Sequence, residues 1–193
     1  MQIIDISRDL TTATLYPGSK PVELKQLSSV AKGDLCTLTA LTADLHAGTH
    51  VDAPLHFIDK GADIASMPLA HFIGPCQVVS VESGELKASS LLKRLPFGTK
   101  RILLKNSFET FLTSACAQAL AEQKILTLGV EGLSPAPFNN EKEIHTTLLF
   151  AKIALIESLD LSQTEDGEYF LSAAPIKISG GEAAFTRAVL IRF

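Results

Sequence analysis

The sequence predicts a mixed α/β domain in which strands outnumber helices and form a barrel-like sheet with flanking helices. Short apolar runs bounded by turn residues recur along the whole chain, whereas only three segments show a helical apolar pattern. These runs do not alternate regularly with helices and no internal repeat is present, which argues against a doubly wound sheet. The length of 193 residues and the 46% hydrophobic content fit one domain over residues 1–193.

The expected strands follow from apolar or Thr-rich segments between Pro and Gly turn signals. The chain begins with a strand over residues 3–6, and a long strand from Leu35 to Leu45 leads into a histidine-rich segment. The remaining strands are expected over residues 76–82, 101–105, 125–130, 152–157, 168–171, 176–178 and 187–192.

Three helices are expected from apolar spacing and capping residues. The first is short and covers residues 89–95. The second begins at Thr113 or Ser114 and continues to about Gln123. The third covers residues 139–150 and has an apolar stripe on one side.

Composition excludes several classes of partner. The net charge is −4 and Lys and Arg do not cluster, so the chain lacks the electrostatic footprint of a nucleic-acid-binding protein. No apolar run approaches the roughly 18 residues of a membrane span, and the N-terminus lacks the pattern of a signal peptide. The three cysteines are widely separated and odd in number, so we expect no disulfide framework and a cytoplasmic location.

Residues 46–56 contain three of the five histidines of the chain, together with one aspartate. Neutral imidazoles and carboxylates are the usual protein ligands of zinc, manganese and iron. A single histidine is more often a structural residue, but this clustering is unexpected in a chain where histidine is sparse. The segment therefore predicts a metal centre that contains His46, His50 and Asp52.

The spacing of these ligands favours an extended segment. A helix would place His46 and His50 on one face but would turn Asp52 away from them. Gly48 and Pro54 also disfavour a helix. In an extended chain the even-numbered residues 46, 48, 50 and 52 share one face, and Gly48 leaves room for an ion.

Two neighbours of the segment receive other roles. His56 lies beyond Pro54, where the chain is expected to turn, so it suits a general acid/base better than a metal ligand. Asp44 shares the even-numbered face and is interpreted as a charge at the strand edge.

Further ligands must come from elsewhere in the chain, where the unused histidines are His71 and His145. His145 lies on the third expected helix, and Glu157 ends an apolar strand where a carboxylate needs a partner. The spacing favours His145 over His71 and Glu157 over Glu143 only modestly, so these alternatives stay open.

Residues 46–57 resemble the H-x-G-T-H-x-D-x-P-x-H signature of the cyclase family of metal-dependent enzymes, which includes bacterial kynurenine formamidase and isatin hydrolase. The resemblance covers nearly the whole chain, because five further segments are similar to family members: Asp5-Ile6-Ser7, Tyr16-Pro17-Gly18, Gly74-Pro75-Cys76, Gly129-Val130-Glu131 and Pro175–Gly181.

The resemblance implies a swivelling β/β/α fold that assembles as a homodimer or homotetramer. It implies that His46, His50, Asp52 and Glu157 hold one divalent ion, Zn or Mn. It further implies that a second ion, when present, is held by His145, with Asp52 and Glu157 bridging the two ions.

The implied function is hydrolysis of a C–N bond in a small amide, formamide or lactam by metal-activated water, with N-formyl-kynurenine as the reference substrate. The resemblance assigns the catalytic acid/base role to His56. Tyr16 stands where kynurenine formamidases have a tryptophan, so it either contacts substrate or packs over its turn. Glu131 stands where the family tends to have aspartate.

Three alternatives are weighed against this expectation. A metal-assisted cyclase or dehydratase, or a lactone hydrolase, would use the same ions. A non-catalytic metal-binding protein would keep the ligands, but it would not need His56. A serine or cysteine hydrolase is disfavoured, because no G-x-S-x-G motif is present and the cysteines lack cationic neighbours.

Overall fold

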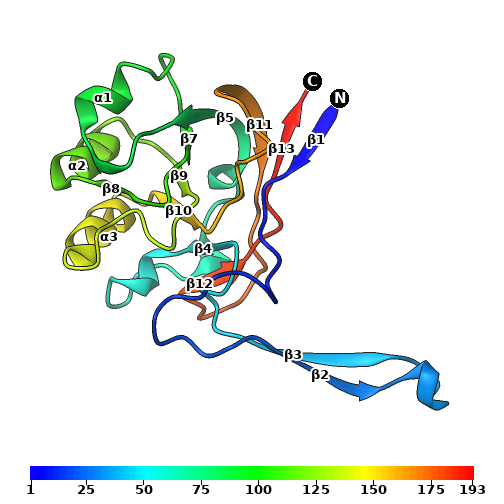
Figure 1. The fold of residues 1–193 in the computed structure, drawn as a ribbon. Helices are drawn as coiled ribbons and strands as arrows, with labels where there is room; N and C mark the ends of the chain where they lie inside the picture. The colour runs from blue at the N-terminus through cyan, green and yellow to red at the C-terminus, as the bar shows by residue number, and fades with distance from the viewer.

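The computed structural model describes residues 1–193 and is built on a nine-stranded sheet that curls into a half-barrel (Figure 1). In spatial order its strands are β1 (Gln2–Asp5), β13 (Val189–Arg192), β11 (Gly167–Ser172), β5 (Ile73–Ser80), β7 (Arg101–Lys105), β9 (Thr127–Val130), β10 (Ala154–Glu157), β4 (His50–Asp52) and β12 (Ala183–Phe185). The expected mixed α/β domain with a barrel-like sheet is confirmed.

The middle of this sheet is parallel. Strands β5, β7, β9 and β10 pair in parallel, and their connections carry the three α-helices. These helices are α1 (Ala88–Leu92), α2 (Ser114–Glu122) and α3 (Glu141–Phe150), and they cover one face of the sheet (Figure 1). Regular βαβ crossovers are therefore present, and our expectation of none was wrong. Two short strands, β6 (Gly84–Leu86) and β8 (Thr110–Leu112), interrupt the connections and obscure the pattern in the sequence.

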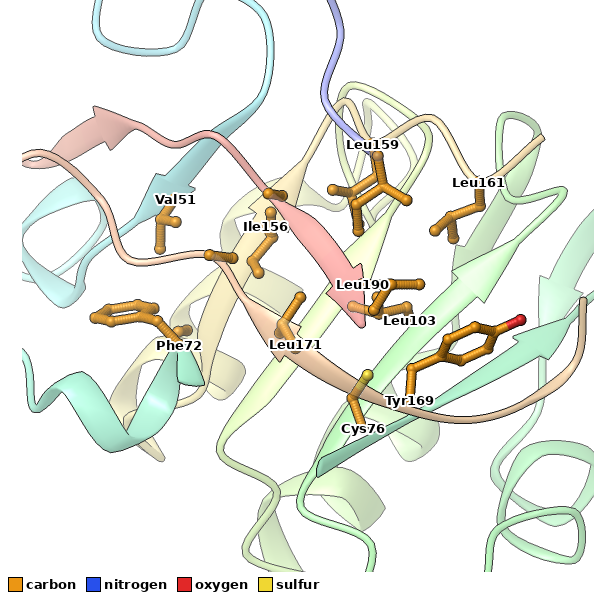
Figure 2. Packing of buried hydrophobic residues seen from close by; sticks show 14 of the residues in the cluster. Val51, Phe72, Cys76, Leu103, Ile156, Leu159, Leu161, Tyr169, Leu171 and Leu190 are labelled. Carbon is orange, nitrogen blue, oxygen red and sulfur yellow. The ribbon is translucent and has the colours of Figure 1, made fainter. Parts of the chain in front are cut away.

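The middle of the sheet is buried on both faces by two separate apolar cores. Neighbouring residues of one strand divide between them: Leu103 and Ile156 face the inner core, whereas Leu104 and Leu155 face the helices. This follows from the two-residue period of a strand and explains the continuous apolar runs of the parallel strands. Figure 2 shows the inner core, where side chains from β5, β7, β10, β11 and β13 meet.

A hairpin of β2 (Glu23–Ser28) and β3 (Leu38–Thr42) projects from the body of the molecule (Figure 1). The expected long strand over residues 35–45 is shorter, and its partner β2 was missed. The physical reason is that neither strand of the hairpin has a buried face, so the sequence carries no alternation of apolar and polar residues.

The other expectations agree with the structure to different degrees. The strand over residues 101–105 has the predicted bounds, and Thr113 caps α2 by accepting a hydrogen bond from the Cys116 amide at 3.1 Å. The expected strand over residues 176–178 is absent, and β12 forms instead. Four single-turn 3₁₀ helices complete the fold: η1 (Val30–Lys32), η2 (Pro54–His56), η3 (Ile64–Ser66) and η4 (Leu69–His71). None of the helices combines the length and apolar character that a membrane crossing requires.

Candidate metal centre

Strand β4 places two of the predicted ligands on one face of the sheet. It lies between β10 and β12, and His50 and Asp52 are separated by one strand period. Glu157 on β10 is the direct cross-strand partner of His50, so its side chain emerges on the same face. The exposed fractions of these three residues are only 1–4%. Sheet pairing therefore holds three predicted ligands together in the interior.

His46 reaches the same place by a different route from the one we expected. Only residues 50–52 are extended, and residues 45–49 form a turn in which Gly48 has a φ of +61°. The turn brings His46 Nδ1 to 3.1 Å from Asp52 Oδ1 and 3.2 Å from His50 Nε2. The prediction of one extended face from His46 to Asp52 was thus wrong, although its ligands do meet.

Gly48 is needed for the turn and not for space around an ion. A side chain there would adopt a strained backbone conformation, because its φ lies in the left-handed region. Its Cβ would also meet Leu10 at 3.3 Å and Ala13 at 3.7 Å, which are residues of the N-terminal loop.

Helix α3 supplies His145, whose Nε2 lies 3.3 Å from Glu157 Oε1. The ligand atoms form two groups, one of His46, His50 and Asp52 and one of Asp52, His145 and Glu157, and within each group all atoms lie within 4.8 Å of one another. Asp52 is shared by the two groups. The structure therefore brings together all five residues that were expected as ligands.

The surroundings of the Asp52 carboxylate indicate whether these residues fit a cation. Both of its carboxylate oxygens are buried and neither has a hydrogen-bond partner. The rings of His46 and His50 are near, at 3.1 and 3.4 Å, but they are not oriented to donate to the carboxylate. Burying an unpaired carboxylate is costly, and a cation between the converging atoms would remove that cost. Three imidazoles and two carboxylates are a donor set that suits zinc or manganese.

The pKa values of the clustered residues also indicate that a positive charge is favoured among them. Burial alone would lower the pKa of His50, but Asp52 and Glu157 outweigh it and raise that pKa to about 10. Burial likewise opposes, and Glu157 causes, the raised pKa of His145. The pKa of Asp52 is lowered by the His46 and His50 rings, against burial, which would raise it. Protons on imidazoles here balance carboxylate charge that a divalent cation would balance instead.

An open pocket of about 560 Å³ lies above the cluster. Four of the five expected ligands line this pocket, namely His46, His50, His145 and Glu157, and we call them its floor. Tyr16, Phe57 and the carboxylates of Asp44, Glu141 and Glu182 also line it, and we call them its rim. Its 15 lining residues include no Lys or Arg, and they are Tyr16, Ser19, Ala43, Asp44, Leu45, His46, His50, His56, Phe57, Leu133, Ser134, Glu141, His145, Glu157 and Glu182. A small molecule entering this pocket therefore meets the ligand cluster directly.

His56 lines the pocket beside the ligands but belongs to neither group. The 3₁₀ turn η2 places its ring 4.2 Å from the ring of His46, centroid to centroid. Burial lowers the pKa of His56, so its imidazole is neutral near pH 7 and able to accept a proton.

Tyr16 also lies in the pocket, where its hydroxyl donates a hydrogen bond to Glu141 Oε2 at 2.8 Å. Its ring stacks on Phe138 with centroids 6.5 Å apart. Burial, and then the contact with Glu141, raises the pKa of Tyr16 to about 12, so the phenol stays neutral.

The competing residues lie elsewhere. His71 donates from Nδ1 to the Leu126 carbonyl at 3.1 Å and lines no part of the pocket, so it is structural. Glu143 is exposed on α3 and belongs to neither ligand group.

Two other carboxylates have local partners. Asp44 lines the pocket and accepts a hydrogen bond from the Lys20 amide at 3.2 Å, without joining the ligands. Glu131 is buried and accepts from the amides of Asn106 and Leu161 at 2.5 and 2.9 Å, which is a structural role.

Among the carboxylates of the pocket, Glu141 and Glu182 were missed in the sequence. Glu182 Oε1 lies 3.4 Å from His46 Nε2. The one signal for Glu182 was its position directly after Gly180-Gly181, in a segment that matches the family. No sequence pattern pointed to Glu141, because its side chain bonds to Tyr16, which is 125 residues away in the chain.

The fold, the buried ligand cluster and the open pocket define a metal-dependent hydrolase. A family model described as "Putative cyclase" matches residues 4–137. The chain belongs to this cyclase family.

Two relatives cover nearly the whole chain. A kynurenine formamidase of Salinibacter ruber is 31% identical over an alignment of 206 positions, gaps included. The alignment covers 98% of this chain and 97% of that protein. A kynurenine formamidase of Bacillus anthracis is 28% identical over 200 residues, which cover 97% of this chain and 96% of that protein.

Solved structures share the fold. A protein described as a potential metal-dependent hydrolase with cyclase activity superposes with a TM-score of 0.85 at 26% identity, covering 98% of this chain and 96% of that one. Isatin hydrolase A from Ralstonia solanacearum gives a TM-score of 0.84 at 21% identity, covering 99% and 92%. At that identity, the second likeness concerns the fold alone.

Proposed function

We propose that this chain hydrolyses the C–N bond of a small amide, with an N-formyl aryl amine as the best-supported substrate class. The observation that carries the proposal is the buried Asp52 carboxylate, which has no hydrogen-bond partner and is surrounded by potential ligands that line an open pocket. The two kynurenine formamidases that match almost the full chain support the formamide class.

The five clustered residues would hold one or two Zn or Mn ions, and Asp52 belongs to both ligand groups. Such ions polarise a carbonyl and make water a nucleophile at neutral pH. The sheet contributes order: because His50, Asp52 and Glu157 project from paired strands, their positions require no rearrangement when substrate arrives.

His56 is proposed as the catalytic acid/base. It reaches the pocket beside the ligands, and its lowered pKa leaves a neutral imidazole to receive a proton from the attacking water. The same imidazole then delivers that proton to the nitrogen of the departing amine, which would otherwise leave as an unstable anion.

Aromatic side chains at the rim would hold the aryl group. The ring of Tyr16 lies over Phe138, and the ring of Phe57 stacks on His145 with centroids 4.5 Å apart. Flat apolar surfaces of this kind favour an aromatic amide over an aliphatic one.

The direct test is an assay of the Zn- or Mn-loaded protein on N-formyl-kynurenine, isatin and an aryl lactone. We expect the formamide to be hydrolysed with the highest kcat/KM. A protein that holds metal but leaves all three intact would contradict the proposal. Faster lactone opening would move the function to the lactonase alternative.

Ring closure is the second candidate, because one structural neighbour is described as having cyclase activity. To separate the two, the protein is incubated with the ring-opened products of isatin and of the lactone, and any cyclised compound is detected by mass spectrometry. A purely metal-binding role fits less well, since it would require neither the pocket nor His56.

We also propose that the chain forms a homodimer or homotetramer through the β2–β3 hairpin. Leu24 and Leu41 are cross-strand partners, yet they are 59% and 47% exposed, and Leu27 and Leu38 are also exposed. An isolated two-stranded hairpin is marginally stable, so a second copy of the chain is the expected cover for this surface.

Light scattering tests this assembly. We expect the double substitution Leu24→Ser and Leu41→Ser to reduce the mass of the particle, and an unchanged mass would contradict the hairpin interface. The single domain over residues 1–193, the cytoplasmic location and the lack of nucleic-acid or membrane partners stay predictions.

A further inference from the structure

The three imidazoles of the metal centre differ in what holds their outer nitrogen. His50 donates from Nδ1 to the Gly48 carbonyl at 2.9 Å, and His145 donates from Nδ1 to the Glu141 carbonyl at 2.9 Å. Both contacts place hydrogen on Nδ1 and leave Nε2 to face the other ligands. A backbone carbonyl thus selects the tautomer of each of these two rings.

His46 is turned the opposite way. Its Nδ1 faces the centre, 3.1 Å from Asp52 Oδ1, and its Nε2 points outward. The group opposite Nε2 is Glu182 Oε1, at 3.4 Å. For Nδ1 to act as a ligand, hydrogen must lie on Nε2, and the negative charge of the Glu182 carboxylate, 3.4 Å from Nε2, favours this tautomer.

We propose that Glu182 is a positioning residue of the metal centre, which fixes the tautomer and ring orientation of His46 so that Nδ1 coordinates the ion. The inference rests on the metal centre of the proposed function but not on any particular substrate. A carboxylate acceptor also strengthens the imidazole as a donor to the metal.

The backbone holds Glu182 where this role requires it. Its carbonyl accepts a hydrogen bond from the Ala53 amide at 2.9 Å, and the next residue, Ala183, is the cross-strand partner of Asp52. The chain arrives there through a turn in which Gly180 has a φ of +75°. The Gly-Gly-Glu segment therefore fixes the base of the Glu182 side chain against the ligand strand β4.

Substitution of Glu182 is a safe test because its side chain is 39% exposed and its only ion-pair partner is His46. We expect Glu182→Ala to weaken Zn²⁺ binding about 10-fold, the lower end of the effect of removing such a partner. Glu182→Gln keeps a side-chain oxygen next to Nε2 but loses the negative charge, so its loss of affinity should be smaller than that of Glu182→Ala. The affinity is measured by competition with a chromophoric chelator.

Asp44→Ala is the matched control. It removes a carboxylate from the same pocket, but Asp44 accepts from a backbone amide and contacts no ligand. We expect its Zn²⁺ affinity to change less than twofold. Equal weakening by Glu182→Ala and Asp44→Ala would overturn the proposal, since it would mean that only pocket charge matters.

The tautomer is visible by ¹⁵N NMR of the histidine-labelled, Zn²⁺-loaded protein. We expect coordination through Nδ1 for His46 and through Nε2 for His50 and His145, and mixed signals for His46 in Glu182→Ala. Coordination of His46 through Nε2 in the unaltered protein would overturn the inference. Neither measurement uses a substrate, so failure to hydrolyse formamides would overturn the proposed function alone.

Discussion

The floor and the rim of the pocket are built in different ways. The floor residues His50 and Glu157, and Asp52 beside them, lie on paired strands and are almost fully buried. The rim residues Tyr16 and Glu182 lie on loops or at a strand end and are partly exposed. This difference indicates two roles: sheet register fixes the proposed ligands, whereas loop side chains surround the entrance to the pocket.

The two regions are joined at the start of α3. The side chain of Glu141 accepts a hydrogen bond from the Tyr16 hydroxyl, and its backbone carbonyl accepts one from His145 Nδ1. One residue therefore connects the loop that faces substrate to a ligand of the proposed metal centre.

The largest effect is expected from Asp52→Asn, which removes the carboxylate shared by the two ligand groups. We expect activity to fall to that of metal-free protein, because Asp52 belongs to both ligand groups. The unaltered protein should gain about 2.7 kcal/mol of unfolding free energy when Zn²⁺ is added at 100 times its Kd, and the variant should gain almost none.

Calorimetry with and without Zn²⁺ measures this difference. Retained metal-dependent stabilisation in Asp52→Asn would show that the centre does not depend on this carboxylate.

The next effect separates catalysis from metal binding at the border of floor and rim. In His56→Ala we expect kcat to fall about 10²- to 10⁴-fold, the usual contribution of a general acid/base, while the metal content stays unchanged. Elemental analysis and steady-state kinetics on one preparation check both. Full turnover with full metal content would remove His56 from the mechanism.

The floor was also the part that the sequence could predict. The spacing of His46, His50 and Asp52 marks a metal centre by itself, because three ligands within seven residues need no knowledge of the fold. The choices of His145 over His71 and of Glu157 over Glu143 needed the family resemblance, since strand pairing across the chain is invisible to local spacing.

The rim and the hairpin were less predictable for physical reasons. Glu141 and Glu182 act through single side-chain contacts to residues far away in the chain, which leave no periodic pattern. The turn at Gly48 was mistaken for extended chain, because a glycine fits either conformation. Strand β2 lacks a buried face, so the alternation that marks strands is missing.

The charge of the rim gives the third prediction. Besides the proposed ligand Glu157, the pocket is lined by Asp44, Glu141 and Glu182, with no Lys or Arg to oppose them. We expect a formamide with an ammonium group, N-formyl-kynuramine, to have a kcat/KM about 10-fold above that of the carboxylate analogue 3-(2-formamidobenzoyl)propanoate at low salt.

Because this preference is electrostatic, it should shrink as the salt concentration rises toward 1 M, where the Debye length is about 3 Å. Both compounds carry the same scissile bond, so the neutral 2-formamidoacetophenone serves as the reference. A preference for the anionic substrate would show that a cationic group outside these lining residues reaches the pocket.

The smallest effect is expected at the connection between rim and floor. Tyr16→Phe removes the hydroxyl that donates to Glu141 but keeps the ring over Phe138. We expect KM to rise about two- to threefold with kcat nearly unchanged, because a hydrogen bond of this kind contributes about 1 kcal/mol or less and the ligands remain in place. Tyr16→Ala, which also removes the ring, should raise KM further. If Tyr16→Phe instead lowered kcat at constant KM, the phenol would take part in the chemical step, and the division between a catalytic floor and a selective rim would fail at this residue.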